Sequence, residues 1–582
     1  MHVSLTQYRE ILGTYLAPQW RRVAVLAVLL VIDLVLQLAL PQIVQAFLDT
    51  AIAGVVLDTL LLIAAAYLAI AIGQKGTFVG WHYLAQHVGL VATNQIRSDL
   101  TLHCLKLDMA FHNARTPGEM IERVDGDVTR LGNFLSQFLV QLALNGLLLL
   151  GAIGLLFVID WRVGVPTAIG VVLAIISARL LTRQITEYSV KERQASAELY
   201  GMIEERLSGT EDIRANGAVQ YVLRRHIERA RVLFRTSVRR ALLGVLSWRS
   251  LNMAISIGAT ISLALAAVLA LDGVLTIGQV YLVFAYTNLL HDPVEQLMRQ
   301  LDDLQQATAS ISRVNELFDT RPQVVADPRG TLLPAGALAV GLHDISFGYP
   351  DDDLVLRAIS ADIPAGTTLG LLGRTGSGKT TLTRLLLRLY DPTVGAVRLG
   401  GVDLRMVPNA DLRARVAIVT QDIQLFSATV RENLTLFDAT IDDPQIMAAL
   451  ATLGMHDWVA ALPHGLDTLL ASGSTGLSAG QAQLLAFARA FLRDPGLVIL
   501  DEASSRLDPA TERTLEYAVT RLLHGRTGII IAHRLATLDR VDQIMLLEHG
   551  TIGEYGLRAQ LAGDPRSRFA QLRQLGMEEA LS

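Results

Sequence analysis

Six predominantly apolar stretches occupy the first half of this chain, and they constrain its fold more than any other feature. Each approaches or exceeds the length that a helix needs to cross a bilayer core of roughly 30 Å. The stretches cover residues 23–48, 57–81, 134–159, 163–181, 251–271 and 277–290. Apolar residues make up 51% of the 582-residue chain and charged residues 18%, which departs from ordinary globular usage. We therefore predict six membrane-spanning helices, the last of them the shortest.

Basic residues gather in two long connections, and this asymmetry predicts the orientation. The connections between the second and third stretches and between the fourth and fifth are rich in Arg and Lys, whereas the short connections contain only Arg162. By the positive-inside rule the long connections lie in the cytoplasm, as does the N-terminus with Arg21 and Arg22. An even number of spans leaves the C-terminus in the cytoplasm too. We expect a multi-pass protein of the inner (cytoplasmic) membrane.

The two long connections carry apolar residues at helical spacing but no long apolar run. This pattern predicts that the spanning helices continue well beyond the bilayer and meet in short turns. Candidate turns are residues 112–118 and 208–212. Residues 4–17 form a weakly amphipathic segment, which either lies on the inner membrane surface as an elbow helix or is an ordinary solvated helix.

Polar side chains within the apolar stretches are candidate functional residues, because a charge is costly there. Asp33 either contacts a substrate or pairs with Lys75, and Lys75 either pairs or reaches toward the inner surface. Amide side chains in the first and third stretches either line a polar, water-filled interior or hold helices together. These amides are Gln37, Gln42, Gln45, Gln141 and Asn145.

Charge and cysteine content exclude several other classes. A net charge of −5 gives no sign of nucleic-acid binding. The single cysteine, Cys104, excludes an intrachain disulfide and the usual thiolate metal cluster. The chain becomes strongly apolar only after Arg22 and shows no small-residue cleavage site, so we interpret the first stretch as a retained span.

A change in composition separates the two halves of the chain. Residues 318–337 are polar and contain Pro322, Pro328 and Pro334, as expected of a linker. After them, short apolar strands alternate with helices, which predicts a parallel α/β core. We therefore expect a transmembrane domain over residues 1–317, the linker, and an α/β domain over residues 338–582.

The second half contains the phosphate-binding pattern G-x-x-x-x-G-K-[ST]. It reads Gly373-Arg374-Thr375-Gly376-Ser377-Gly378-Lys379-Thr380 and lies between an apolar strand and a helix. Glycines let backbone N–H groups approach a phosphate, and the helix start adds partial positive charge. Lys379 would neutralise the outer phosphates, and the Thr380 hydroxyl would hold Mg²⁺. The pattern predicts a site for ATP and Mg²⁺.

Two further segments carry candidate site residues. Residues 497–502 form an apolar strand that ends in Asp501 and Glu502. Asp501 would bind Mg²⁺, and Glu502 would orient or deprotonate the attacking water. The sequence Leu477-Ser478-Ala479-Gly480-Gln481 precedes a strong helical pattern, so it forms either an anion site or an ordinary helix cap by Ser478.

In this order the segments resemble the half-size exporters of the ATP-binding-cassette (ABC) family, over residues 1 to about 575. That resemblance implies an α-helical transmembrane domain followed by an α/β P-loop ATPase domain with a helical subdomain. Residues 477–481 are similar to the family signature Leu-Ser-Gly-Gly-Gln, with Ala479 in place of the first glycine. Further roles are implied by the resemblance: Tyr349 stacks on adenine, Gln421 contacts Mg²⁺ and couples to the membrane loops, His533 contacts the γ-phosphate, and Thr381 and Asp508 belong to the nucleotide site.

The resemblance also implies a partner. In the family, two ATPase domains face each other head to tail, so each ATP lies between the phosphate loop of one chain and the signature of the other. This chain has Ala482-Gln483 where the family commonly has an Arg, and residues 472–476 lack the usual acidic residue. Together with Ala479, these departures resemble the asymmetric exporters. We expect a heterodimer of two half-transporters with one fully active ATP site, and keep a homodimer as the alternative.

The implied function is ATP-driven export of a small or amphipathic substrate, such as a drug, a lipid or a peptide, from a membrane-lipid environment. Two alternatives stay open. One is an importer built on the exporter scaffold, for example for siderophores. The other is a membrane-tethered ATPase that regulates a partner without moving a substrate.

Overall fold

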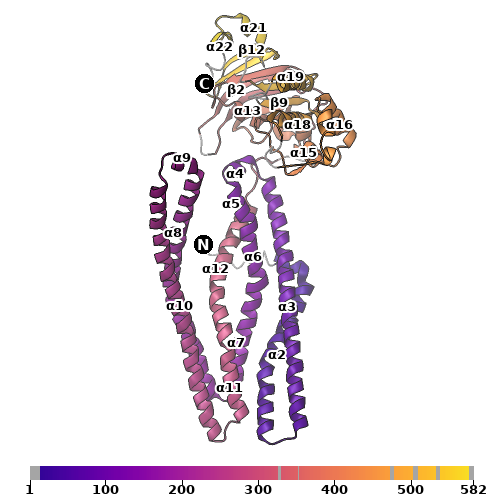
Figure 1. Ribbon diagram of the computed structural model, residues 1–582. Coiled ribbons are helices and arrows are strands. Elements are labelled where there is room, and N and C mark those ends of the chain that lie inside the picture. Colours follow the sequence, from indigo (N-terminus) through magenta and orange to yellow (C-terminus); the bar gives the residue numbers. More distant parts are fainter. Residues whose placement is uncertain are drawn as a thin grey trace. The chain divides into compact units, whose positions relative to one another are not determined.

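The computed structural model describes residues 13–325, 329–350, 353–471, 477–501, 509–532 and 538–575. The chain forms two compact units (Figure 1). The first contains the chain up to Leu105 together with Pro117–Thr320, and the second contains Lys106–Thr116 and the chain from Arg321 onward. The first is helical and the second is an α/β fold with a helical subdomain, so the predicted fold class is confirmed.

The helices of the first unit extend far beyond their apolar segments. A short 3-10 turn, Ala17–Gln19, leads into α2 (Trp20–Ile52), which is followed by α3 (Leu57–Lys106), α8 (Trp161–Ser208), α9 (Thr210–Ala215) and α10 (Val219–Leu271). Helices α3, α8 and α10 have 50, 48 and 53 residues. At about 1.5 Å per residue each exceeds roughly 70 Å, more than twice the bilayer core. The predicted continuation of the spans beyond the apolar segments is confirmed, and the second predicted turn falls between α8 and α9.

The third span is one helical run that contains two π-helical stretches. Its parts are α5 (Pro117–Ile121), η2 (Glu122–Asp127), α6 (Val128–Asn133), η3 (Phe134–Phe138) and α7 (Leu139–Ile159). The run packs closely on α3, because a Cβ at Gly132 would lie 2.1 Å from Thr93 Oγ1 and one at Gly89 would lie 2.2 Å from Ser136 Cβ. π-helical turns are rare and occur frequently at functional positions.

The sixth span is divided into α11 (Ile277–Leu289) and α12 (His291–Asp319). Pro293 in the first turn of α12 has no N–H to continue the hydrogen-bond ladder of α11. In the part of the chain that the structure describes, five helices have the length and hydropathy of a membrane span. Helix α11 has 13 residues, fewer than the roughly 20 that a span needs, so the sixth crossing needs part of α12 as well.

Most of the predicted intramembrane polar residues hold helices together. Asp33 is 1% exposed and accepts hydrogen bonds from Gln74 Nε2 (3.0 Å) and Thr77 Oγ1 (3.2 Å), so the interpretation that pairs it with Lys75 is wrong. Two further contacts join the first and third spans to the sixth: Gln42 donates to the Tyr286 hydroxyl at 3.1 Å, and Asn145 donates to Gln296 at 2.8 Å. Gln45 instead donates to Asp49 within α2, at 3.4 Å. Burial of Asp33 gives no support to a substrate contact by this residue.

The second unit is built on a six-stranded sheet with the order β12-β11-β3-β10-β9-β6. These strands are β3 (Thr368–Gly373), β6 (Val416–Val419), β9 (Leu497–Asp501), β10 (Thr527–Ile531), β11 (Gln543–Glu548) and β12 (Thr551–Leu557), all parallel except β12. A four-stranded antiparallel sheet contains β1 (Val340–Phe347), β2 (Leu356–Ile363), β4 (Val394–Leu399) and β5 (Val402–Asp403). The short strands β7 (Ala428–Thr429) and β8 (Leu469–Leu470) form a third sheet.

The larger sheet is buried on both faces, as the near-continuous apolar sequence of its strands requires. Alternate residues of β9 point to opposite sides: Leu497 and Ile499 pack in the cluster with α13 (Lys379–Leu386) and the smaller sheet, whereas Val498 and Leu500 pack with α18 (Ala479–Phe491) and α19 (Pro509–Leu523). The remaining helices are α14 (Asn409–Arg415), α15 (Val430–Thr435), α16 (Asp443–Thr452), α17 (His456–Ala460), α21 (Arg558–Gly563) and α22 (Arg568–Leu575).

The turn between the second and third spans belongs to the second unit. It forms α4 (Met109–Asn113), which overlaps the start of the predicted turn at residues 112–118. Asp108 caps α4 through the Phe111 N–H (3.3 Å) and accepts a hydrogen bond from the Gln323 N–H at 2.6 Å. Phe111 is buried and the Asn113 amide donates to the Tyr390 hydroxyl at 2.8 Å, so α4 is anchored at both ends.

Candidate nucleotide site

The phosphate loop, Gln421, Asp501, Glu502 and His533 lie at or just after the carboxyl ends of four adjacent parallel strands. Leu371 of β3 pairs with Ile531 of β10, Ile531 pairs with Asp501 of β9, and Val419 of β6 pairs with Leu500. These strands therefore end at one edge of the sheet, the position at which open α/β sheets bind ligands. The loop Gly373–Thr380 follows β3, and Gln421 is exposed two residues after β6.

Three predicted site residues lie outside the residues that the structure describes. They are Glu502, which follows β9, His533, which comes two residues after β10, and Asp508. The strands that precede Glu502 and His533 are described and are adjacent in the sheet. Asp501 is half-buried at the end of β9.

The loop after β3 has the backbone that a phosphate cradle requires. Gly376 and Gly378 have φ angles of 81° and 105°, a region that other residues rarely adopt. A Cβ at Gly378 would also lie 2.5 Å from Leu356 Cδ2, and one at Gly373 would lie 2.4 Å from Leu547 O. Residues 373 and 378 therefore have no space for a side chain, and their backbone conformations also favour glycine.

Lys379 and Ser377 are buried in this loop. Lys379 is 7% exposed, and its Nζ donates to the carbonyl oxygens of Gly373 (2.6 Å) and Arg374 (2.9 Å). The Ser377 hydroxyl is 5% exposed and has no hydrogen-bond partner in the described part of the chain. Helix α13 begins at Lys379, so its free N–H groups and the lysine charge meet at the loop. This combination favours an anionic phosphate group.

A cavity of about 560 Å³ opens on the loop. Residues 373–377 form one side, residues 546–549 at the end of β11 form another, and α22 contributes Arg568, Gln571 and Leu572. The contribution of α22 to the cavity was not predicted, because the sequence of this short helix does not indicate which part of the fold it packs against. Glu554 fixes α22 by accepting hydrogen bonds from the Ser567 hydroxyl (3.0 Å) and the Phe569 N–H (2.9 Å).

Tyr349 and Thr381 lie together beside the loop helix. The Tyr349 hydroxyl is 3.1 Å from Thr381 Oγ1 and accepts a hydrogen bond from Arg384 at 2.9 Å. Its ring meets Tyr390 edge-on, with 5.3 Å between ring centres. Thr381, predicted as a nucleotide ligand, thus holds Tyr349, and Thr380 is the exposed hydroxyl at the helix start. Burial raises the pKa of Tyr390, whose hydroxyl remains a neutral hydrogen-bond partner for Asn113.

The signature segment forms the start of α18. The Ser478 hydroxyl accepts from the Gln481 N–H (3.2 Å), and the Gln481 side chain accepts from the Ser478 N–H (3.0 Å). The predicted helix cap is therefore confirmed as a capping box. Ala479 is exposed and Gly480 is buried. Among the described residues, the cavity beside Gly373–Ser377 has no lining residue from this segment.

Arg489 connects α18 to the segment that follows Gln421, and sequence reasoning missed it. Its Nε donates to Asn433 O at 2.7 Å and its Nη1 to Gln424 O at 3.0 Å. Asn433 is fully buried and also holds Phe426 through the Phe426 N–H at 2.9 Å. Burial lowers the pKa of Arg489, which still carries its charge at neutral pH. A lone basic residue within the apolar run of residues 484–491 was the available signal.

Both halves of the chain match known families. The model described as the ABC transporter transmembrane region matches residues 23–294, and the model described as ABC transporter matches residues 356–505. The chain is 30% identical to an ATP-dependent lipid A-core flippase of Thiobacillus denitrificans over 574 residues, which cover 98% of each chain. It is also 30% identical to a putative multidrug export ATP-binding/permease protein of Bacillus subtilis, over 84% of each chain.

A solved structure agrees over almost the whole length. A bacterial Atm1-family ABC exporter with ATP bound superposes with a TM-score of 0.78 at 25% identity, covering 97% of this chain and 98% of the other. The helical unit, the phosphate loop at the edge of the parallel sheet and the order of the two family matches lead to one conclusion. The chain belongs to the ABC transporter family, as a half-size exporter that is embedded in a membrane and couples ATP hydrolysis to transport.

Proposed function

We propose that this chain is one half of a dimeric exporter for a small or amphipathic substrate, such as a drug, a lipid or a peptide. The observation that carries the proposal is the alignment of four strand ends, which collects the phosphate loop, Gln421 and Asp501 at one edge of the ATPase unit. Relatives named as a lipid A-core flippase and as a putative multidrug export protein support an amphipathic substrate. Transport would be driven by closure of two ATPase units on ATP, with reset after hydrolysis.

The proposed roles at the site follow the order of the strands. Lys379 and the loop N–H groups bind the outer phosphates, and Tyr349 receives the adenine. Thr380, Gln421 and Asp501 offer the oxygen donors that suit Mg²⁺, which would supply charge stabilisation at the phosphates when bound. Glu502 would orient or deprotonate the water, and His533 would contact the γ-phosphate. Ser478, Ala479, Gly480, Gln481 and Asp508 would serve the ATP of the partner chain or the dimer contact.

The proposed boundaries are a transmembrane domain over residues 1–317, a linker over 318–337 and an ATPase domain over 338–582. We place both termini in the cytoplasm and the spans in the inner membrane, because the long connections are basic. The second turn contains helix α9, which is exposed and charged. We propose that α9 binds a partner chain in the dimer.

We propose that the partner is a different half-transporter. Ala479 places a methyl group at the start of α18, at the position where the family signature has a glycine, and this would weaken the ATP site to which the chain lends its signature. The phosphate loop of this chain keeps every residue of its pattern. The expected complex has one fully active site.

Reconstitution in liposomes tests the function. The chain, with any partner that copurifies, is assayed for ATP-dependent movement of two probes, the dye Hoechst 33342 and a fluorescent phosphatidylethanolamine. Movement out of the side that holds the ATPase units supports export, and movement toward that side would indicate an importer. ATP hydrolysis without movement of either probe, and without stimulation by either, would favour the membrane-tethered ATPase.

A further inference from the structure

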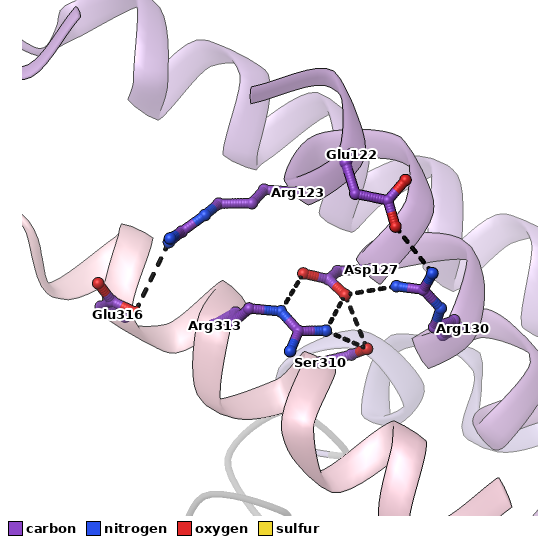
Figure 2. Close-up of polar contacts among 7 residues, drawn as sticks. All are labelled: Glu122, Arg123, Asp127, Arg130, Ser310, Arg313 and Glu316. Carbon is purple, nitrogen blue, oxygen red and sulfur yellow. Dashed lines mark hydrogen bonds and ion pairs between the residues drawn. The ribbon is translucent and has the colours of Figure 1, made fainter. Parts of the chain in front are cut away.

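A buried carboxylate in the first unit has no part in the ATP site. Asp127 ends the π-helical stretch η2 and is fully buried, in the polar extension that precedes the apolar segment 134–159. Figure 2 shows that its oxygens face the side chains of α12. Burial of a carboxylate is costly unless the charge is paired and hydrogen-bonded, so the partners determine what this residue does.

Arg313 and Ser310 of α12 supply those partners. Arg313 donates from Nε to Asp127 Oδ2 at 2.7 Å and from Nη2 to Oδ1 at 2.5 Å, and the buried Ser310 hydroxyl donates to Oδ1 at 2.9 Å. Arg130 donates to Oδ1 from the other side at 2.9 Å. Burial alone raises the pKa of Asp127, but the hydrogen bonds from Arg313 and Ser310 and the charge of Arg313 outweigh it, so the pKa lies below its usual value. The carboxylate is therefore charged at neutral pH.

More exposed contacts surround this pair. Arg130 reaches Glu122 at 2.7 Å, and Arg123 reaches Glu316 at 3.6 Å (Figure 2). From α3, His103 Nε2 lies 2.9 Å from Leu317 O and 3.1 Å from Thr320 O, at the last turn of α12. Exposed ion pairs contribute little each, so the two-pronged contact of Arg313, whose side chain is 40% exposed, with the buried Asp127 carboxylate is the part that fixes the geometry.

The same two spans are also joined within the apolar region. Asn145 of α7 donates to Gln296 of α12 at 2.8 Å, and Gln300 of α12 donates to Gln141 of α7 at 3.3 Å. With Asp127 and Arg313, these contacts run along α12 from its first turns to its last. The third span is thus hydrogen-bonded to α12 at three positions: Asp127, Gln141 and Asn145.

The position of the pair along the chain gives it a mechanical role. The third span begins at Pro117, directly after the segment Lys106–Thr116 that belongs to the second unit, and α12 ends at Asp319, directly before the chain enters that unit at Arg321. Both helices therefore receive any displacement of the ATPase unit through their covalent ends. Asp127 and Arg313 join the helices a few turns from those ends.

We propose that Asp127 is a positioning residue for energy coupling: with Arg313 and Ser310 it locks the extensions of the third and sixth spans into a single lever. Loss of the lock lets each helix respond separately, so ATP is hydrolysed without a concerted change in the membrane domain. This inference rests on the proposed export cycle, in which ATP opens the outer side of the spans.

A set of variants, each purified with any partner that copurifies and placed in lipid nanodiscs, tests the lock. The set comprises Asp127→Asn, Arg313→Gln, the double variant, and the control Glu122→Gln, which removes only the exposed pair with Arg130. A background of Cys104→Ser and Leu275→Cys places a thiol in the connection between α10 and α11, where Leu275 is 7% exposed. The rate at which a water-soluble maleimide modifies this thiol is measured with and without ATP and vanadate, next to ATP hydrolysis and the melting temperature.

We expect ATP with vanadate to accelerate labelling in the parent and in Glu122→Gln. In Asp127→Asn and Arg313→Gln this acceleration should fall at least about fivefold. Both variants should retain ATP hydrolysis. Arg313→Gln leaves the buried Asp127 carboxylate without its main partner and should melt earliest, Asp127→Asn should melt earlier than the parent by less because Arg313 is partly exposed, and the double neutral variant should regain melting temperature. The acceleration should stay lost in the double variant. Its recovery together with stability would show a purely structural pair and overturn the proposal.

Hydrogen exchange supplies a second measurement, which does not depend on the spans opening to the outer side. Asp127→Asn should exchange faster than the parent in residues 117–133 and 307–319, and Glu122→Gln should not. Unchanged exchange in Asp127→Asn overturns the lock itself. Absence of ATP-dependent labelling in the parent, with normal hydrolysis, instead refutes the proposed export cycle and the inference that rests on it.

Discussion

At the scale of single residues, Lys379 has two tasks in the phosphate loop, and one substitution removes both. Its Nζ bonds two carbonyl oxygens of the loop and supplies the only positive charge within the loop that is buried. Lys379→Ala should weaken ATP binding by about 10- to 100-fold, because hydrogen bonds to a charged group are worth about 1.5–3 kcal/mol. Equilibrium binding of a fluorescent ATP analogue measures this. Lys191→Ala, which removes an exposed lysine of α8, is the matched control, and binding within twofold of wild type in Lys379→Ala would contradict the assignment.

Substitution of Glu502 should stop ATP hydrolysis without preventing ATP binding. Glu502→Gln keeps the size of the side chain but removes the base proposed to act on water, so ATP should stay bound while steady hydrolysis at this site stops. Nucleotide retained after rapid gel filtration and phosphate release are the two measurements. Unimpaired phosphate release from the purified variant, with any partner present, would show that the base lies elsewhere.

The glycine-rich loop lies between a strand and a helix, as the sequence predicted, because its constraints are local. Glycine at residues 376 and 378 is required by φ, and Lys379 by its position at a helix start. Arg489, Asn433 and the α22 wall could not be found in this way. Their roles depend on which distant segments pack together. The sequence around a single arginine in a helix does not show which groups accept its hydrogen bonds.

At the scale of elements, Arg489 fixes α18 to the segment after Gln421. Arg489→Lys should lower the stability of the ATPase unit by about 1–3 kcal/mol, because a lysine cannot reach both Asn433 O and Gln424 O and leaves a buried acceptor unpaired. Thermal unfolding of the full chain measures the shift. Arg493→Lys is the control, since Arg493 makes one long contact of 3.3 Å with Arg413 O. Equal melting of the two variants would show that Arg489 does not hold these elements.

Helix α4 depends on one side-chain hydrogen bond at its end. Tyr390→Phe removes the hydroxyl that accepts from Asn113 but keeps the ring against Tyr349. We expect a loss of about 0.5–1.5 kcal/mol in the docking of residues 106–116, seen as faster hydrogen exchange there. Asn113→Ala should give the same result, and the double variant should be no worse than either. Additive effects would mean that the two residues act independently.

The apolar periodicity predicted which segments are helices, but not how they join. Five spans followed from length and hydropathy alone. The division of the sixth at Leu290 reflects Pro293, which was visible but was not used. The π-helical stretch at residues 122–127 was not predictable, because an extra residue in a helical turn is stabilised by contacts such as Asp127 with Arg313, which lie 186 residues apart in sequence.

At the scale of the whole molecule, the order of domains was evident from composition, but the assignment of Lys106–Thr116 to the ATPase unit was not. A segment of eleven residues between two long helices looks like an ordinary turn in sequence. Its docking depends on Phe111 and Asn113 meeting a surface built by residues more than 200 positions away. Long-range complementarity of this kind leaves no periodic pattern.

The oligomeric state decides how many ATP sites work. The described residues that line the cavity at the phosphate loop include none of the signature Ser478–Gln481, and we propose that a second chain completes the site. If the partner differs, the chain expressed alone should purify as a monomer or an unstable dimer with low hydrolysis. Ala479→Gly should then raise turnover only at the site that uses this chain's signature. Mass photometry in nanodiscs and the stoichiometry of vanadate-trapped nucleotide measure both. A stable homodimer that traps two equivalents of nucleotide and transports unaided would refute the asymmetric complex and leave the rest of the export cycle intact.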